Sequence, residues 1–222
     1  MIIAIEGIDG SGKGTQARLL VEAIREAGKQ VDFLQFPRYE ETGFGREVGR
    51  YLNGEFGELD QVHPKFAAML YALDRFESVG SIRASIAAGH IVVCDRYVGS
   101  NLAHQSARMP EEKRADIQVW ISDLEHTILG VPKPDIVFFL DMPPNSARRL
   151  IASKDARSYT DKVEDLHEAS SDHLQNALTA FRQLAEKHSW HRIECTDADG
   201  TVRTQEVVHN AIMASLRQSF GT

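Results

Sequence analysis

One short segment of the chain has the residue types of a phosphate-binding loop. Residues 7–15 read GIDGSGKGT, and they place Lys13 directly after the second of two glycines spaced five apart. Backbone N–H groups of such a loop can converge on phosphate oxygens because no Cβ stands in the way. A helix beginning here would add partial positive charge, and Lys13 would reach the β- and γ-phosphates of a nucleoside triphosphate. We expect a P-loop rather than a merely structural turn, with these phosphate-binding residues: Gly7, Gly10, Ser11, Gly12, Lys13, Gly14 and Thr15.

The residue after the lysine bears on metal binding. Loops of this type usually place Ser or Thr there to hold Mg²⁺, whereas this chain has Gly14, with Thr15 one residue further along. Carboxylates are the alternative, and Asp9 lies within the loop while Asp95 ends an apolar run. Asp95 alone is equally typical of a helix N-cap. Arg96 beside it favours a ligand site, because parallel sheets bind ligands at the carboxyl ends of their strands. We therefore predict that Asp9 and Asp95 hold Mg²⁺.

A parallel sheet is the element that would bring these residues together. The chain has four short apolar runs and a weaker fifth, at 2–6, 31–36, 91–95, 135–141 and 190–195. The four strong runs are apolar almost throughout rather than alternating with polar residues, which is typical of strands buried on both faces. Helical patterns lie between them, at 13–27, 63–88, 111–129, 143–152, 162–188 and 203–218. This order predicts an α/β sandwich with right-handed crossovers, and no repeat or linker divides the single domain expected over 1–222.

Composition limits the class of partner. The 222 residues are 42% hydrophobic and 26% charged, as in ordinary globular proteins, and the net charge is −7. This charge argues against nucleic acid or an anionic membrane as a partner, so any anion must be bound by a local group of cations. Cys94 and Cys195 form no CxxC pair, which argues against a disulfide scaffold or a zinc site. Without a long apolar run, the chain is expected to be cytoplasmic.

Further motifs resemble those of one family. They are EGIDGSGKGTQ at 6–16, FPRY at 36–39, YALDRFE at 71–77, CDRYVGSNLAHQ at 94–105, GVPKPDIVFFLD at 130–141 and DKVE at 161–164. In this order they resemble the thymidylate kinase family nearly from end to end. The resemblance implies a five-stranded parallel sheet of order 2-3-1-4-5, a small lid at about 149–162 and a homodimer. It also implies transfer of the γ-phosphate of ATP to dTMP in the presence of Mg²⁺, which gives dTDP.

The resemblance also assigns residues to the nucleoside of the acceptor. Tyr71 corresponds to an aromatic residue that packs on the thymine ring, and Arg75 to an arginine that contacts the base. Asn101 and Gln105 fall where the family lines the base pocket, and Tyr97 falls beside the deoxyribose. Taken singly, these residues have simpler interpretations: Tyr71 as core, Arg75 as a surface ion pair with the preceding aspartate, and Asn101 as a helix cap.

A second group is assigned to the acceptor phosphate. Arg96 and Arg38, the latter after Phe36 in FPRY, correspond to arginines that hold this phosphate, although Arg38 alone would be read as a solvated loop residue. Asp9 corresponds to an acid near the sugar and the magnesium, and Glu164 to an acid that closes over the acceptor.

The loop itself carries no arginine, and relatives of this kind take a catalytic cation from the lid. The candidates are Arg149, Lys154 and Arg157, of which Arg157 is the first choice beside Lys13, Asp9 and Arg96.

Other activities fit parts of the pattern. The GKGTQ segment alone suggests an adenylate or UMP/CMP kinase, and a deoxynucleoside kinase or a nucleotide-binding regulator without turnover would also carry a P-loop. A hydroxyl acceptor would need a base near residues 36–39, where FPRY suits a phosphate acceptor better. A phosphate monoester is mostly a dianion at neutral pH and needs no base. None of the nine histidines is therefore expected to be catalytic.

Overall fold

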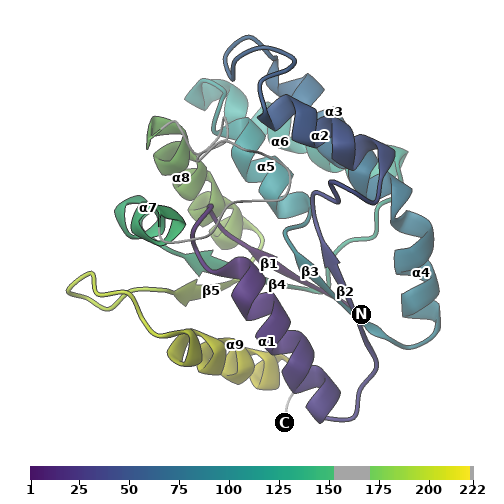
Figure 1. Ribbon diagram of the computed structural model, residues 1–222, viewed down its shortest axis with the longest axis vertical. Coiled ribbons are helices and arrows are strands. Elements are labelled where there is room, and N and C mark those ends of the chain that lie inside the picture. Colours follow the sequence, from purple (N-terminus) through teal and green to yellow (C-terminus); the bar gives the residue numbers. More distant parts are fainter. Residues whose placement is uncertain (153–170, 221–222) are drawn as a thin grey trace.

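The computed structural model of the protein describes residues 1–152 and 171–220, and a parallel sheet forms its centre (Figure 1). Within this part the strands are β1 (Ile2–Glu6), β2 (Val31–Gln35), β3 (Ile91–Asp95), β4 (Ile136–Asp141) and β5 (His191–Glu194). They pair in the order β2-β3-β1-β4-β5, and every pair is parallel. The predicted fold class and strand order are confirmed, including the weaker fifth strand.

The register of the central strands sets up the site. Ile5 of β1 lies opposite Asp95 of β3, so both strands end at the same edge of the sheet. The loop after β1 and the Arg96 that follows β3 are therefore neighbours, and the backbone N–H of Arg96 donates to the carbonyl of Ile5 at 3.0 Å. This edge is the expected ligand-binding end of a parallel sheet.

Helices cover both faces of the sheet. On one face α1 (Lys13–Glu26) packs against α9 (Gln205–Phe220), as Figure 1 shows in purple and yellow. On the other, α5 (Val98–Ser106) lies between α6 (Glu111–Ser122) and α8 (Ser171–Lys187). Within the predicted helix 162–188, the structure describes only the part that forms α8. The short helix α7 (Pro144–Ala152) follows β4.

Two predicted helices are each divided in the structure. The stretch 63–88 forms α3 (Pro64–Glu77) and α4 (Val79–Ala87), because Ser78 ends the first helix and begins the second. The stretch 111–129 continues from α6 into a π-helical segment, η1 (Asp123–Ile128). Wider turns of this kind are frequent at functional sites, and this one carries Glu125 into the interior.

Two helices were not predicted. In α2 (Gly43–Leu52), three glycines of low helix propensity obscure the pattern, but the Thr42 side chain accepts from Gly45 N at 2.9 Å and caps the helix. In α5 every residue is buried, polar ones included, so no apolar stripe marks it.

The hydrophobic core joins residues of all five strands, and a smaller cluster of Val48, Tyr51, Leu52 and Ala67 lies between α2 and α3. Among the described residues, no helix combines the length and hydropathy that crossing a membrane requires.

Candidate functional site

The P-loop lies where the sequence predicts it, between the end of β1 and the start of α1. Gly10 and Gly12 have φ values of 79° and 89°, which disfavour residues with a Cβ. A Cβ on Gly10 would lie 2.3 Å from the carbonyl oxygen of Ala147, so the loop passes too close to α7 for any side chain there. Helix α1 begins at Lys13 without a side-chain cap, so its first N–H groups are available to bind an anion.

Lys13 is poised for a polyanion. Its side chain is buried, and Nζ donates to the carbonyl of Ile8 at 2.7 Å. Burial, together with the charge of Arg96, lowers the pKa of Lys13 to about 8, although Asp9 and Asp95 act in the opposite direction. A bound polyphosphate would favour the charged ammonium and so offset the cost of burial.

Gly14 has a steric explanation. A Cβ at this position would lie 2.9 Å from Asp95 Oδ2, which is closer than side-chain packing allows. The carboxylate of Asp95 thus approaches the helix at the position where related loops carry a hydroxyl. A cleft, called here the P-loop cleft, runs along the loop and is lined by Lys13, Gly14 and Asp95. Arg18, one turn further along α1, also lines it.

The residues at this point fit a divalent cation. Burial raises the pKa of Asp95, and within the described residues its Oδ1 has no hydrogen-bond partner. An orphaned buried carboxylate oxygen is what a cation would satisfy. In the same part of the chain no group of three or more His, Cys, Asp or Glu residues could form a complete protein cage. One or two carboxylates plus substrate phosphates are typical of Mg²⁺ rather than of zinc.

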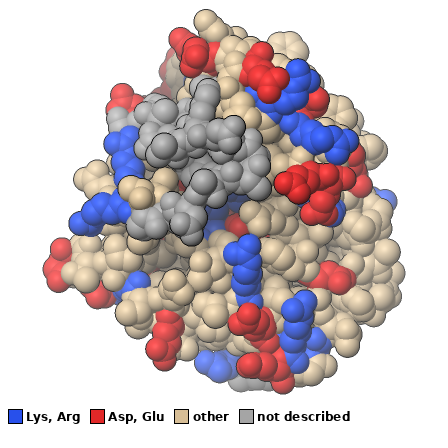
Figure 2. All heavy atoms as spheres, viewed as in Figure 1, with Lys and Arg blue, Asp and Glu red and all other residues tan. Residues whose placement is uncertain are grey.

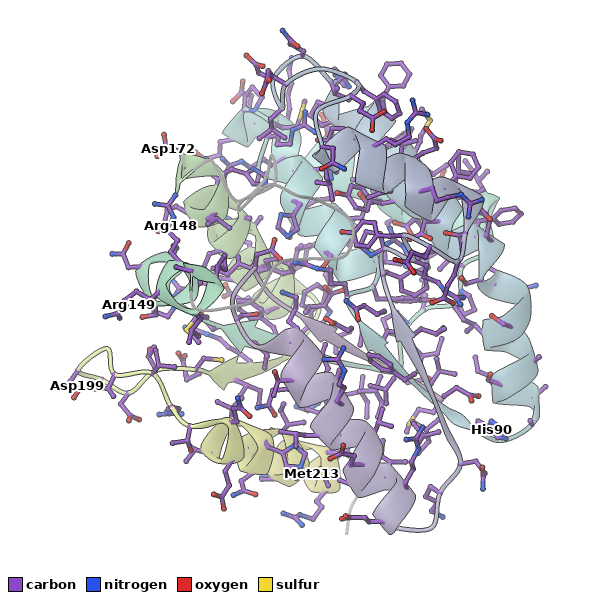
Figure 3. All side chains as sticks on the ribbon, viewed as in Figure 1. His90, Arg148, Arg149, Asp172, Asp199 and Met213 are labelled. Carbon is purple, nitrogen blue, oxygen red and sulfur yellow. The ribbon has the colours of Figure 1, made fainter. Side chains whose placement is uncertain are left out.

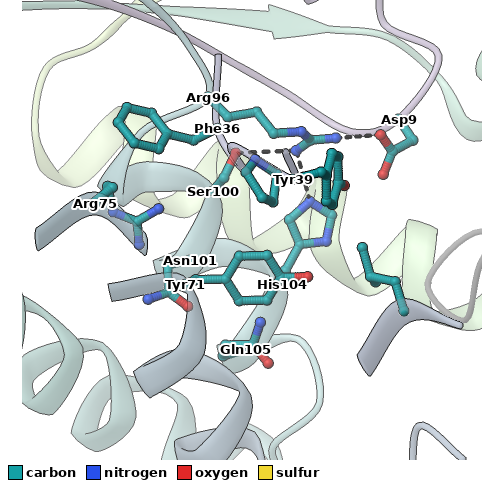
Figure 4. Close-up of a pocket in the computed structure, with 12 residues that line it drawn as sticks. Asp9, Phe36, Tyr39, Tyr71, Arg75, Arg96, Ser100, Asn101, His104 and Gln105 are labelled. Atoms are coloured by element: carbon teal, nitrogen blue, oxygen red, sulfur yellow. Dashed lines mark hydrogen bonds and ion pairs between the residues drawn. The ribbon is translucent and has the colours of Figure 1, made fainter. Parts of the chain in front are cut away.

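Arg96 stands between two cavities. It and Asp9 line both the P-loop cleft and a second pocket bounded by α3 and α5. Its φ of 64° is unusual for a residue with a side chain. The guanidinium pairs with Asp9 through Nη2, while Nη1 donates to Ser100 Oγ at 3.1 Å and lies 3.4 Å from His104 Nε2 (Figure 4).

The floor of the second pocket holds a buried ion pair. Arg75 Nε and Nη2 both donate to Glu125 at 2.5 Å, and the side chains are 2% and 0% exposed. The interpretation of Arg75 as a surface partner of Asp74 is wrong, because Asp74 instead accepts from Thr42 Oγ1 and Arg38 N. The charges are buried together because the π-helical turn of η1 carries Glu125 inward.

Two side-chain amides on α5 line the same pocket. Asn101 Nδ2 donates to Glu125 Oε1 at 2.8 Å, and Gln105 Oε1 accepts from Arg108 at 3.0 Å. These contacts orient the amides, so that the acceptor Asn101 Oδ1 and the donor Gln105 Nε2 have no protein partner in the part of the chain that the structure describes. An unsatisfied acceptor beside an unsatisfied donor matches the polar edge of a nucleobase.

Aromatic side chains supply the apolar walls. Phe36, Tyr39 and Tyr71 line the pocket (Figure 4). The Arg75 guanidinium lies 6.0 Å from the centre of the Phe36 ring. Tyr71 also packs edge-on against Tyr51, at 6.5 Å and 88°, so it is both part of the smaller apolar cluster and a wall of the pocket.

Some predicted residues lie elsewhere. Arg38 donates to Ser78 Oγ at 2.9 Å and pairs with Glu41, while Tyr97 is fully buried and donates its hydroxyl to the carbonyl of Pro132. Among the described residues, neither Arg38 nor Tyr97 belongs to the lining of the two cavities.

The predicted lid is described only in part. Lys154, Arg157 and Glu164 lie outside the described residues. Arg149 is exposed on α7 at the edge of the view in Figure 3, with Nη2 3.2 Å from Ser146 Oγ.

The sequence analysis missed several residues that line the cavities, namely Arg18, Tyr39, Ser100 and His104, and it missed Glu125 beneath them. Ser100 and His104 follow Arg96 at spacings of four and eight, which is one helical face. That spacing could have identified them if α5 had been recognised. On the face shown in Figure 2, Lys and Arg are interspersed with Asp and Glu.

Comparisons with known proteins agree on one family. The profile of the thymidylate kinase family matches residues 5–206. A thymidylate kinase of Mycobacterium tuberculosis is 34% identical over 186 residues, which are 83% of this chain and 86% of the relative. A probable thymidylate kinase of Thermococcus kodakarensis is 34% identical over 226 residues, covering 100% of this chain and 99% of the relative. A solved structure of thymidylate kinase from Candida albicans shares the fold, with a TM-score of 0.74 at 20% identity over 98% of this chain and 91% of that one.

Proposed function

The chain belongs to the thymidylate kinase family and phosphorylates dTMP to dTDP with ATP, and on this premise we propose that the cleft at Lys13 holds ATP while the pocket at Arg96 holds dTMP. The observation that carries this assignment is that Arg96 and Asp9 line both cavities. The two substrates would then meet at a point where one arginine can contact both, as transfer between two phosphates requires.

On the donor side, the P-loop amides and Lys13 would bind the phosphates of ATP. Asp95 would hold Mg²⁺ together with these phosphates, and Asp9 would hold it directly or through water. When bound, the ion neutralises charge on the β- and γ-phosphates. Arg18 extends the positive wall of this cleft. A Cβ on Gly14 would lie 3.7 Å from Arg18 Nη1 and 2.9 Å from Asp95 Oδ2, so both side chains approach the helix at this position.

On the acceptor side, the amides of α5 would read the base. Asn101 Oδ1 can accept the imide N–H of thymine, and Gln105 Nε2 can donate to a ring carbonyl. Tyr71 and Phe36 would pack against the ring. Arg75 would contact the base while it stays paired with Glu125. Its burial at the pocket supports this role, whereas an arginine in a surface ion pair would not reach the base.

The transfer itself would rest on charge and position. The dTMP phosphate is mostly a dianion near neutral pH, so no residue needs to remove a proton. Lys13 and Arg96 bring two polyanions together, and fixed cations aimed at developing charge are the largest source of rate enhancement in such reactions. A lid cation, with Arg157 first, and closure by Glu164 remain predictions. So do acceptor contacts from Arg38, whose side chain would have to leave Ser78 and Glu41, and from Tyr97.

Three broader features are also proposed. The chain acts in the cytoplasm as one kinase domain, and it forms a homodimer. For the dimer the support is an exposed apolar surface on α3 and α6, where Phe66 and Val119 are 62% and 63% exposed. Lys65 lies over the ring of Trp120 at 4.8 Å and ties the two helices together at this surface.

The decisive experiment is steady-state kinetics of Arg96→Ala. We expect the KM for dTMP to rise and kcat to fall by about a hundredfold or more, because a charged partner of the transition state is lost. Arg83→Ala, on exposed α4, serves as the control. If Arg96→Ala left both constants for dTMP unchanged, the monophosphate would not bind in this pocket.

A further inference from the structure

Two buried histidines lie in series behind Arg96. His104 of α5 is 7% exposed, and His173 in the first turn of α8 is 5% exposed. His104 Nδ1 lies 3.3 Å from His173 Nε2, and His104 Nε2 lies 3.4 Å from Arg96 Nη1. Phe181 of α8 packs edge-on against the His104 ring at 5.6 Å and fixes its plane.

The donors and acceptors assign a direction to this series. A guanidinium can only donate, so His104 Nε2 must act as the acceptor for Arg96. The neutral ring then carries its proton on Nδ1, and this N–H donates to His173 Nε2. The tautomers of both rings thus follow from the charge of the arginine at the end of the series.

The other contacts of Arg96 show the same arrangement. Ser100 Oγ donates to Glu6 Oε2 at 2.5 Å, and so presents a lone pair to Arg96 Nη1. Asp9 accepts from Nη2. Every contact in this set therefore presents an acceptor to the guanidinium, and Ser100 and His104 are each oriented by a further residue behind them, Glu6 and His173.

We propose that His173, acting through His104, is a positioning residue that holds the Arg96 guanidinium ready for the acceptor phosphate. This rests on the proposed role of Arg96. An arginine loses rotamer freedom when it is fixed, and a contact made before binding removes that cost from substrate binding. The histidines take no proton from the substrate, in keeping with a phosphate acceptor that needs no base.

The test compares paired variants by the KM and kcat of both substrates. His104→Gln keeps an acceptor for Arg96 and a donor for His173, whereas His104→Leu keeps only the volume. We expect the leucine variant to raise the KM for dTMP about tenfold and the glutamine variant to stay within about threefold. The KM for ATP should not change in either. His90→Leu, at the far end of β3 beside Asp32 (Figure 3), is the control.

His173 gives the sharper result because Arg96 is not its direct partner in the series. His173→Leu should raise the KM for dTMP about threefold, His173→Gln should restore it, and neither change should add to the effect of His104→Leu. A folded His173→Leu or His104→Leu enzyme with an unchanged KM for dTMP would overturn the proposal. Equal effects of Gln and Leu, or equal increases in the KM for both substrates, would also overturn it.

A second measurement does not depend on the variants. Nitrogen-15 NMR of histidine-labelled wild-type protein should show His104 protonated at Nδ1 and unprotonated at Nε2, and the reverse tautomer would refute the series. Arg96→Ala separates the two proposals. If it raises the KM for dTMP while His173→Leu does not, only the positioning role fails; if it has no effect, the proposed function fails first.

Discussion

The buried pair of Arg75 and Glu125 gives a prediction in which stability and substrate binding can be separated. Glu125→Ala would leave the guanidinium of Arg75 buried without a counter-charge and remove one of the two acceptors of Asn101 Nδ2. Loss of one partner of a buried ion pair costs about 3–5 kcal/mol of unfolding free energy. For a chain of this size that corresponds to a melting temperature lower by roughly 6–20 °C. Differential scanning calorimetry of Glu125→Ala and wild type measures it directly.

The matched double variant replaces both charges. Arg75→Met combined with Glu125→Leu leaves no unpaired charge, and apolar replacement of buried ion pairs is often neutral or stabilising. We expect a melting temperature within a few degrees of wild type, as about 1 kcal/mol corresponds to 2–4 °C here. The KM for dTMP should nevertheless rise at least tenfold, because Asn101 loses its orientation and the base loses Arg75.

Two results would refute this reasoning. A single variant as stable as wild type would show that the charges are not held together in a dry interior. A double variant with an unchanged KM for dTMP would show that the pair is only structural, and that Asn101 is oriented by its bond to the carbonyl of Ala68 alone.

Three further predictions concern the loop, its lysine and the dimer. Gly14→Ser introduces the hydroxyl that such loops usually carry, yet it should lower kcat, because the new Cβ would lie 2.9 Å from Asp95 Oδ2 and displace that carboxylate. An increase in kcat at saturating Mg²⁺ would contradict this. The pKa of Lys13 is lowered to about 8, so the free enzyme should lose the ammonium as pH rises through 8 and kcat/KM for ATP should fall there, whereas kcat at saturating ATP should stay level. A pH profile between 6.5 and about 9.5 shows whether the two constants separate in this way. Phe66→Glu and Val119→Glu should shift the protein to monomers in analytical ultracentrifugation, and a dimer that survives both changes would place the interface elsewhere.

The elements that the sequence predicted well are those with a single local cause. Apolar runs identified four of the strands and a weaker pattern the fifth, and the P-loop was recognised because its glycines, lysine and helix start lie together in the sequence. Contacts between side chains from distant parts of the chain were not predicted from local patterns. Arg75 could be placed on a helix, but its partner lies fifty positions away, on a turn whose π-helical geometry no local pattern indicates.

Helix α5 shows why the most informative element was also the hardest to find. An amphipathic helix is recognised because one face is apolar, yet both faces of α5 are buried, between the core and the pocket. Ser100, Asn101, His104 and Gln105 occupy positions that an apolar stripe would otherwise take, because each has a polar partner inside the protein or faces the pocket. Buried polar residues on a helix are tolerated when their hydrogen bonds are satisfied, and unsatisfied ones remain where a ligand can complete them. The missing apolar periodicity of residues 98–106, directly after Asp95 and Arg96, is therefore itself a signal of the binding site.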